Sequence, residues 1–228
     1  MRDTLRSKEY FDTFIHEEEE DGVKMFEECI AKGEIEEDRI DSIKDEILLI
    51  KMGIIIAKYS RGDSIKVIKQ EFEGMLNSFY ESWNSEVYED NLIFASIAYL
   101  LGVDNVKLNK IREKLIESET YDYLIDFVLV GSDTTMEKEK ISFPRPYKKL
   151  LRSIECEDKE ALEKYLRGWY KGCQDSSWYD THKIEDDNLY YGYWCFEAGA
   201  VAKRLGFSDE DLKNEQYYPY DMVHFVEE

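Results

Sequence analysis

The sequence contains few residues that interrupt regular secondary structure. Three prolines and twelve glycines in 228 residues are too few for the frequent turns of a β-sandwich. The best strand candidate, residues 127–130, reads more readily as the end of a helix. Because 43% of the residues are hydrophobic, a disordered chain is excluded and ample material for a core is present.

Long apolar segments are missing too. Residues 1–20 carry no apolar stretch followed by a small-residue cleavage site, so no signal peptide is expected. The most apolar run, residues 47–59, contains Lys51 and is too short to span a membrane. The four cysteines lie far apart and form no CxxC pair, which favours reduced thiols in a cytoplasmic protein.

Motifs of enzymes and cofactor-binding proteins are absent as well. His16, His182 and His224 are scattered, without the HExxH or ExxH spacing of a metal site. The sequence has no GxSxG nucleophile turn and no glycine-rich phosphate loop. We therefore expect no metal, no cofactor and no catalytic residues.

Acidic residues are in large excess. There are 51 Asp and Glu residues against 30 Lys and Arg residues, which gives a formal net charge of −21. This charge repels nucleic acids and anionic lipids, whose phosphates need cationic partners. It suits a partner protein that is basic, as nucleases are because they must attract a polyanion.

Apolar residues recur three or four positions apart through most of the chain, which is the period of an α-helix. This pattern predicts helices over residues 3–32, 36–59, 63–82, 89–103, 106–130 (two shorter helices), 158–173 and 185–207. Gly33 is expected to end the first helix, and Asp63 to cap the third. Residues 89–103 are apolar on every side, so this helix should be central. The predicted fold is all-α, a helical bundle of stacked helical hairpins.

The best candidate for a domain boundary is residues 132–146. Its Ser, Thr and Asp residues read as loop, and Pro144 and Pro146 interrupt a helix. The stretch from Lys138 to Arg152 is also basic, with six Lys or Arg residues and one acidic residue. We predict an N-terminal helical domain (1–131), a linker (132–146) and an aromatic-rich C-terminal helical domain (147–228).

Two segments, residues 78–103 and 172–207, resemble each other. Both contain a Ser-Trp pair, then Asp-Asn-Leu, then a closing Leu-Gly followed by an apolar residue. Asp or Asn of the triplet could cap the next helix, which would be seven residues, about two turns, longer in the second segment. We interpret the similarity as an internal duplication of a helical hairpin. Chance similarity is the alternative.

The last forty residues carry a dense pattern of aromatic and small residues. It comprises Tyr190-Tyr191-Gly192-Tyr193-Trp194, Phe196-Glu197, Ala200-Val201-Ala202-Lys203, Leu205-Gly206, Tyr218-Pro219-Tyr220-Asp221 and His224-Phe225. This pattern resembles the C-terminal signature of PoNi-type immunity proteins, the antitoxins of PoNe nuclease effectors. The start, "RDTLRSKEYFDTFI", resembles the opening of the same family's N-terminal domain. The resemblance implies a helical, cytoplasmic, non-enzymatic protein that binds one toxin, and it does not indicate which.

Glu197 is the single carboxylate in the middle of the predicted helix 185–207. In such a helix the rings of Tyr190, Tyr193 and Trp194 would share its side and raise its pKa, as for a general acid. The second carboxylate that glycoside hydrolysis requires is missing nearby, since Asp186 and Asp187 would lie roughly 15 Å away along the helix. We predict a structural anchor bonded to tyrosine hydroxyls or to an arginine such as Arg167. Trp194 and Tyr220 are assigned structural roles too.

Two acidic groups are candidate surfaces for a basic partner. Residues 17–46 hold fourteen acidic and four basic residues, a net charge of −10 that would steer a cationic protein toward them. The second group alternates acids with aromatic rings, which can stack on arginine. The predicted toxin-binding residues are Glu17, Glu18, Glu19, Glu20, Asp175, Trp178, Tyr179, Asp180, Glu185, Asp186 and Asp187. The alternative interpretation is a solvated face whose acids cap helices and whose aromatics fill the core.

The leading hypothesis is an immunity protein that covers the basic active cleft of a cognate nuclease toxin, in the first place a DNase. One alternative is a carboxylate-dependent hydrolase using Glu197, which needs an open cleft at that residue. The other is an acidic helical scaffold protein without a toxin partner. The sequence does not predict an oligomeric state.

Overall fold

The computed structural model describes residues 1–184 and 188–227. Regular structure in these ranges is helical, without a β-strand, so the all-α prediction is confirmed. None of the helices described is long and apolar enough to cross a membrane. The chain forms two compact units, unit 1 (Met1–Ser85 with Asp180–Gly192) and unit 2 (Glu86–Tyr179 with Tyr193–Glu228). The predicted linker 132–146 falls inside unit 2, and the predicted domain division stays a prediction.

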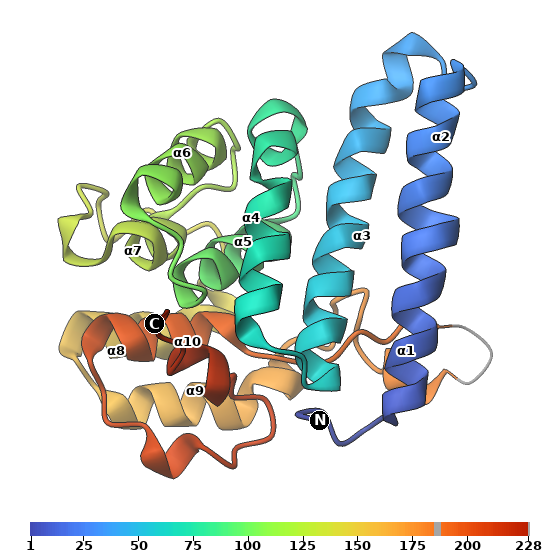
Figure 1. Cartoon of the computed structure of the whole chain (residues 1–228). Coiled ribbons are helices and arrows are strands. Elements are labelled where there is room, and N and C mark those ends of the chain that lie inside the picture. The colour runs from blue at the N-terminus through green and yellow to red at the C-terminus, as the bar shows by residue number, and fades with distance from the viewer. Residues whose placement is uncertain (185–187, 228) are drawn as a thin grey trace. The chain divides into compact units, whose positions relative to one another are not determined.

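Unit 1 is built around the long helix α3. Three segments follow one another as a rod that runs antiparallel to α3 (Figure 1): α1, the π-helical segment η1, and α2. Helix α4 packs on α3 as well, and a short 3-10 turn, η2, precedes α3. The bounds are α1 Lys8–Glu17, η1 Glu18–Lys24, α2 Met25–Lys32, η2 Glu37–Arg39, α3 Ile40–Arg61, α4 Ile65–Ser82 and, in the returning segment, the 3-10 turn η4 Thr181–Lys183. The apolar stripe predicted for residues 3–32 supplies the buried side chains of α1.

The helix ends of unit 1 match the sequence signals in part. Gly33 ends α2 in the left-handed conformation (φ 70°), as predicted, because a residue without Cβ adopts it without strain. Asp63 does not cap α4, so this prediction is wrong. The residue before α4 is Ser64, and the carboxylate of Asp63 instead accepts two hydrogen bonds from the Arg61 guanidinium, at 2.8 and 2.5 Å.

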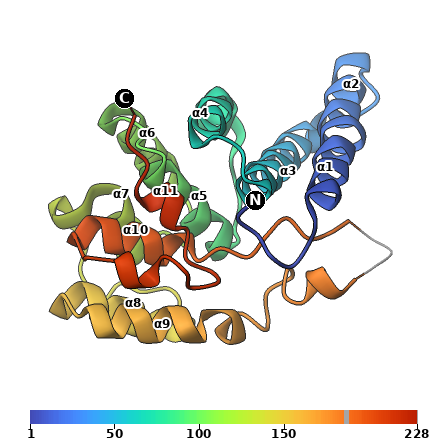
Figure 2. The same ribbon diagram turned by 60° about the horizontal axis from the view of Figure 1, so that its bottom comes forward.

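Unit 2 is organised by α10, which packs against α5, α7, α8, α9 and α11 (Figure 2). Helix α5 is buried on most sides, as its apolar sequence predicted. The region 106–130 forms two helices, also as predicted. The bounds are α5 Tyr88–Leu100, α6 Asn105–Ile116, α7 Tyr123–Val130, η3 Gly131–Asp133, α8 Pro144–Cys156, α9 Lys159–Gly172, α10 Phe196–Leu205, η5 Glu210–Leu212 and α11 Tyr220–Val223.

The single helix predicted over residues 185–207 is not present. α10 begins at Phe196, and residues 188–195 form no helix. Gly192 has φ 116°, which no residue inside an α-helix adopts. Tyr190, Tyr193 and Trp194 therefore do not lie on one helix with Glu197, contrary to the sequence-based expectation.

The two similar segments agree at their C-terminal ends and differ at their starts. Gly102 after α5 and Gly206 after α10 both adopt φ near 65°, and the residue after each donates to a carbonyl five positions earlier. Asp90 and Asn91, however, lie inside α5, whereas Asn188 lies far before α10. Neither Asn caps a helix. The extra seven residues of the second segment belong to the non-helical stretch and not to two additional turns.

Gly199 lets the C-terminal residues pack closely on α10 within unit 2. A Cβ at this position would lie 2.8 Å from Cγ of Pro219 and 2.9 Å from Cγ2 of Val223. Gly168 in α9 offers the opposite case, since the nearest atom to its Cβ would be Lys149 Nζ at 4.0 Å. The two positions form a matched pair.

We predict that Gly199→Ala destabilises the protein by about 1–3 kcal/mol, because the added methyl group overfills the contact. Gly168→Ala should stabilise it by roughly 0.5–1 kcal/mol, because alanine is the better helix former in open space. Urea unfolding of both variants measures the difference. Equal effects of the two substitutions would contradict the close packing on α10.

Candidate binding surface

The acidic run 17–46 covers the end of α1, η1, α2, and the start of α3, all in unit 1. Exposed ion pairs join Glu20 to Lys24 at 2.7 Å and Glu28 to Lys32 at 2.9 Å. Such exposed pairs contribute little to stability. Within residues 1–184 and 188–227, the carboxylates of Asp21, Glu36, Glu37 and Asp38 form no ion pair. A strongly negative field therefore remains on this face.

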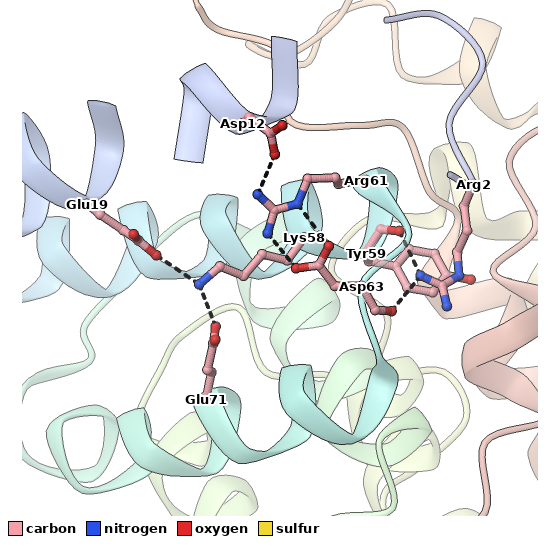
Figure 3. A network of polar contacts seen from close by, with 8 residues as sticks. All are labelled: Arg2, Asp12, Glu19, Lys58, Tyr59, Arg61, Asp63 and Glu71. Carbon is pink, nitrogen blue, oxygen red and sulfur yellow. Dashed lines mark hydrogen bonds and ion pairs between the residues drawn. The ribbon is translucent and has the colours of Figure 1, made fainter. Parts of the chain in front are cut away.

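Lys58 joins the acidic run to the rest of unit 1. Its Nζ donates to Glu19 of η1 at 2.8 Å and to Glu71 of α4 at 2.9 Å, so it lies between the two carboxylates (Figure 3). The lysine side chain is only 12% exposed. Burial by itself lowers the pKa of Lys58, but the hydrogen bonds to the two carboxylates outweigh it, and the pKa is raised. Lys58 thus stays charged and ties η1 and α4 to α3.

Arg61, one turn further along α3, makes a second such link. Its guanidinium donates to Asp12 of α1 at 2.8 Å and to both carboxylate oxygens of Asp63 (Figure 3). The hydrogen bond to Asp63 is the main reason that the pKa of Arg61 is raised. Arg2 closes the network by donating to the carbonyl oxygens of Tyr59 and Asp63, at 3.1 and 2.9 Å. These cations were not predicted as site residues.

Three of the four predicted binding residues of the first acidic group lie in η1, and the fourth, Glu17, is the last residue of α1. Glu17, Glu19 and Glu20 are exposed, while Glu18 is half-buried and its pKa is raised by desolvation and by the neighbouring charges of Glu17 and Glu46. Gly22 lets η1 approach α3, because a Cβ there would lie 3.3 Å from the Ile50 side chain. π-helical turns are rare and are frequently found at functional sites.

A groove of about 370 Å³ lies between η1, α3 and α4. Val23, Ile54, Ile55 and Met75 give it apolar walls, and Lys58 with its partners Glu19 and Glu71 lines it as well. All of these residues belong to unit 1. The groove therefore combines apolar contact area with carboxylates.

The segment that returns to unit 1 from the C-terminal half of the chain packs on α1 and α3. The buried Tyr190 donates its hydroxyl proton to Asp3 at 2.5 Å, and its backbone N–H donates to the Tyr10 hydroxyl at 3.0 Å. Asn188 donates to Glu17 at 2.5 Å. The predicted residues Glu185, Asp186 and Asp187 lie outside the described residues. Asp180, at the start of the segment, pairs with Lys183 at 2.8 Å.

The other predicted binding residues lie in an aromatic cluster of unit 2. Trp178 is buried and stacks on Trp169, with ring centroids 5.3 Å apart. Tyr179 is half-buried and stacks on Tyr170 at 4.6 Å, and Asp175 is exposed. Asp175 and part of Tyr179 are thus accessible at the surface of unit 2, whereas Trp178 is not.

Glu197 lies in the core of unit 2 and is only 3% exposed. Its carboxylate accepts a hydrogen bond from the Tyr165 hydroxyl at 2.6 Å and from the Cys195 thiol at 3.3 Å. Arg167 is not its partner, since that side chain is 59% exposed and pairs with Glu163 and Glu215. A substrate cannot reach Glu197, which removes the open cleft that the hydrolase hypothesis requires.

The two other residues assigned structural roles lie in unit 2 as well. Trp194 is 7% exposed. Tyr220, which begins α11, is half-buried, with its ring 4.2 Å from that of His224. We propose that Trp194, Glu197 and Tyr220 serve the packing of unit 2.

Comparison with known families decides what kind of protein carries this surface. The family described as "PoNe immunity protein (PoNi), N-terminal" matches residues 2–127, and "PoNe immunity proteins (PoNi), C-terminal" matches residues 120–222. The chain belongs to the PoNi family. The resemblance found at both ends of the sequence is thereby confirmed, and the PoNi match spans nearly the whole chain.

A solved structure supports the fold of this PoNi protein. Protein PA2201 from Pseudomonas aeruginosa superposes with a TM-score of 0.60 at 17% identity, covering 81% of this chain and 74% of that one. At this identity the likeness concerns the fold alone. A search of curated proteins gives no match.

The environment of Glu197 predicts a pH effect on stability. Desolvation raises the pKa of Glu197 above the ordinary glutamate value that it regains on unfolding, although the Tyr165 hydrogen bond opposes the shift. A raised pKa means that the contribution to stability is full below the unfolded pKa and declines as the pH rises through the folded one.

We therefore expect Glu197→Gln, which keeps an oxygen acceptor, to gain stability relative to the wild type as the pH rises from 4 to 8, by on the order of 1 kcal/mol. Urea unfolding at several pH values measures this difference. Tyr165→Phe is the companion variant and should steepen the loss at high pH, because it removes the bond that favours the carboxylate. Parallel pH profiles for the wild type and Glu197→Gln would contradict the assignment.

Proposed function

We propose that this PoNi protein neutralises a cognate nuclease toxin by placing the acidic face of residues 17–46 against the basic active cleft of the toxin. The observation that carries the proposal is the dense set of exposed carboxylates held on a folded helical frame by Lys58 and Arg61. A fixed field of this kind steers a cationic protein and suppresses wrong partners. A DNase fits best, because its cleft must attract a polyanion.

The proposed contact residues are of two kinds. Glu17, Glu19 and Glu20, which are exposed on α1 and η1, would meet Arg and Lys side chains of the toxin. Asp175 and Tyr179 would add an acid and a ring that stacks on guanidinium, and the buried Trp178 belongs to the same aromatic cluster as Tyr179 through Tyr170. Glu18, Asp180, Glu185, Asp186 and Asp187 complete the proposed set.

The mode of action proposed here is occlusion without catalysis, in the cytoplasm of the cell that makes the toxin. Family membership supports an immunity role. The burial of Glu197 supports the absence of hydrolysis at that residue. The electrostatic part of the proposal separates it from a scaffold role, because a complex held by exposed charges weakens as salt screens them.

Co-expression with a candidate cognate PoNe toxin tests the immunity role. We expect cells that produce the toxin to grow only when this protein is produced with it, and the two proteins to co-purify. Unchanged killing by the active toxin in the presence of folded protein would refute the immunity role for that pair. A catalytically inactive toxin serves as the control for expression load.

Charge reversal tests which face makes the contact. We predict that the double substitution Glu20→Lys and Asp21→Lys lowers the association rate with an inactive toxin at least about 10-fold at low salt, with a smaller effect at high salt. The matched control reverses two exposed acids of unit 2 that make no ion pair with described residues, Glu113 and Glu119. Both double variants change the net charge equally, so equal losses in stopped-flow experiments would argue against a specific role of residues 17–46.

A further inference from the structure

The groove between η1, α3 and α4 carries a more specific inference. Its α4 wall is formed by residues at helical spacing, Glu71, Gly74, Met75 and Ser78, so one face of α4 lines it. Four residues of α3 line it at the same three- and four-residue spacing: Lys51, Ile54, Ile55 and Lys58. The groove is thus a regular cleft between two packed helices, closed at one side by the π-helical segment.

Gly74 is the unexpected residue of this cleft. It lies in the middle of α4, and an ideal Cβ placed on it would meet no atom within 4 Å. Glycine is a poor helix former, and no neighbour in the described structure would clash with a side chain at this position. Gly199 shows the opposite situation, where a Cβ would meet Pro219 and Val223 below 3 Å. No packing contact within the described structure accounts for a glycine at position 74. The open space above it can accept a group from a partner.

The lining and the surrounding charge define that group. Val23, Ile54, Ile55 and Met75 offer apolar contact, and methionine adapts its shape to a partner. The exposed carboxylates of Glu20 and Asp21 lie on the same π-helical segment, η1, that forms one wall. A volume of about 370 Å³ is at the small end of ligand-sized pockets, the size for a side chain or two rather than for a helix.

We propose that this groove receives an apolar side chain of the cognate toxin, inserted over Gly74 and flanked in the toxin by Arg or Lys residues that contact Glu20 and Asp21. The inference rests on the proposed function and adds to it the anchor point of the complex. A buried apolar side chain surrounded by charge pairs is the usual arrangement of an interface hot spot. The acids then determine how fast the toxin arrives, and the groove determines how long it stays.

The test uses two substitutions at Gly74 and one control. Gly74→Ala should raise the melting temperature, because it improves the helix in open space, and yet weaken binding of the inactive toxin about 10-fold. Gly74→Leu should fill the groove and weaken binding at least 100-fold. Gly168→Ala, a mid-helix glycine with an open Cβ in unit 2, should raise the melting temperature and leave affinity unchanged. Calorimetric titration measures affinity, and thermal unfolding shows that each variant folds.

The outcomes separate this inference from the proposed function. If the wild type binds the toxin and both Gly74 variants bind it equally tightly, the groove is not the anchor, while the immunity role stands. If the wild type neither binds the toxin nor protects cells from it, the proposed function fails, and with it the proposal that the groove receives a toxin side chain. If Gly74→Leu changes sedimentation of the protein alone, the groove belongs to a contact between two copies, which also overturns the proposal. Should Gly74→Leu fail to fold, the affinity of Gly74→Ala decides.

Discussion

The ion pair of Lys58 with Glu19 and Glu71 joins three elements of unit 1, η1, α3 and α4, at the acidic run. Residues 17–21 are five consecutive acids, which repel one another and favour water over a helical neighbour. Lys58 offers one charge to acids from two different elements and is itself nearly withdrawn from water. Lys58 lines the groove, and its ammonium group reaches the carboxylates, as long cationic side chains commonly do when their stems are buried. The hydrogen bond to Glu19 connects the acidic π-helical segment to α3.

Inside the protein, acids are satisfied in another way. Asp122 accepts hydrogen bonds from the backbone N–H groups of Leu124, Ile125 and Ser142, and from the hydroxyl of Tyr88. Glu197 and Asp209 accept from the hydroxyls of Tyr165 and Tyr218, both at 2.6 Å. Buried polar groups of this kind are tolerated because each finds a donor. Two of these hydrogen bonds join helices of unit 2, from Tyr88 of α5 to the N-cap of α7 and from Tyr165 of α9 to Glu197 of α10.

The carboxylates of the chain therefore fall into two groups, one buried and hydrogen-bonded and the other exposed. Asp3 of unit 1 and Asp122, Glu197 and Asp209 of unit 2 are buried and accept from hydroxyl or backbone donors, whereas the acids of residues 17–46 remain largely exposed. Exposed like charges weaken the folded state, so their accumulation on one face is a cost that a function must offset. In the function proposed above, binding of a cationic toxin offsets this cost, and the chain belongs to a family of immunity proteins.

The sequence by itself determined the helical class, the position of α5 in a core, and the helix ends at Gly33, Gly102 and Gly206, because these follow from local periodicity and backbone conformation. It also identified the family, since the aromatic pattern of residues 190–225 is dense. Other expectations failed, some for local and some for tertiary reasons. Asp63 is bound by Arg61, two positions away, and Gly192 turns the chain out of helical conformation. Tyr190 packs against Asp3 of the N-terminal segment, 187 positions away in sequence. The groove at Gly74 and the ion pairs of Lys58 could not be predicted from the sequence either. Both depend on which helices pack against one another, and local sequence patterns do not specify that.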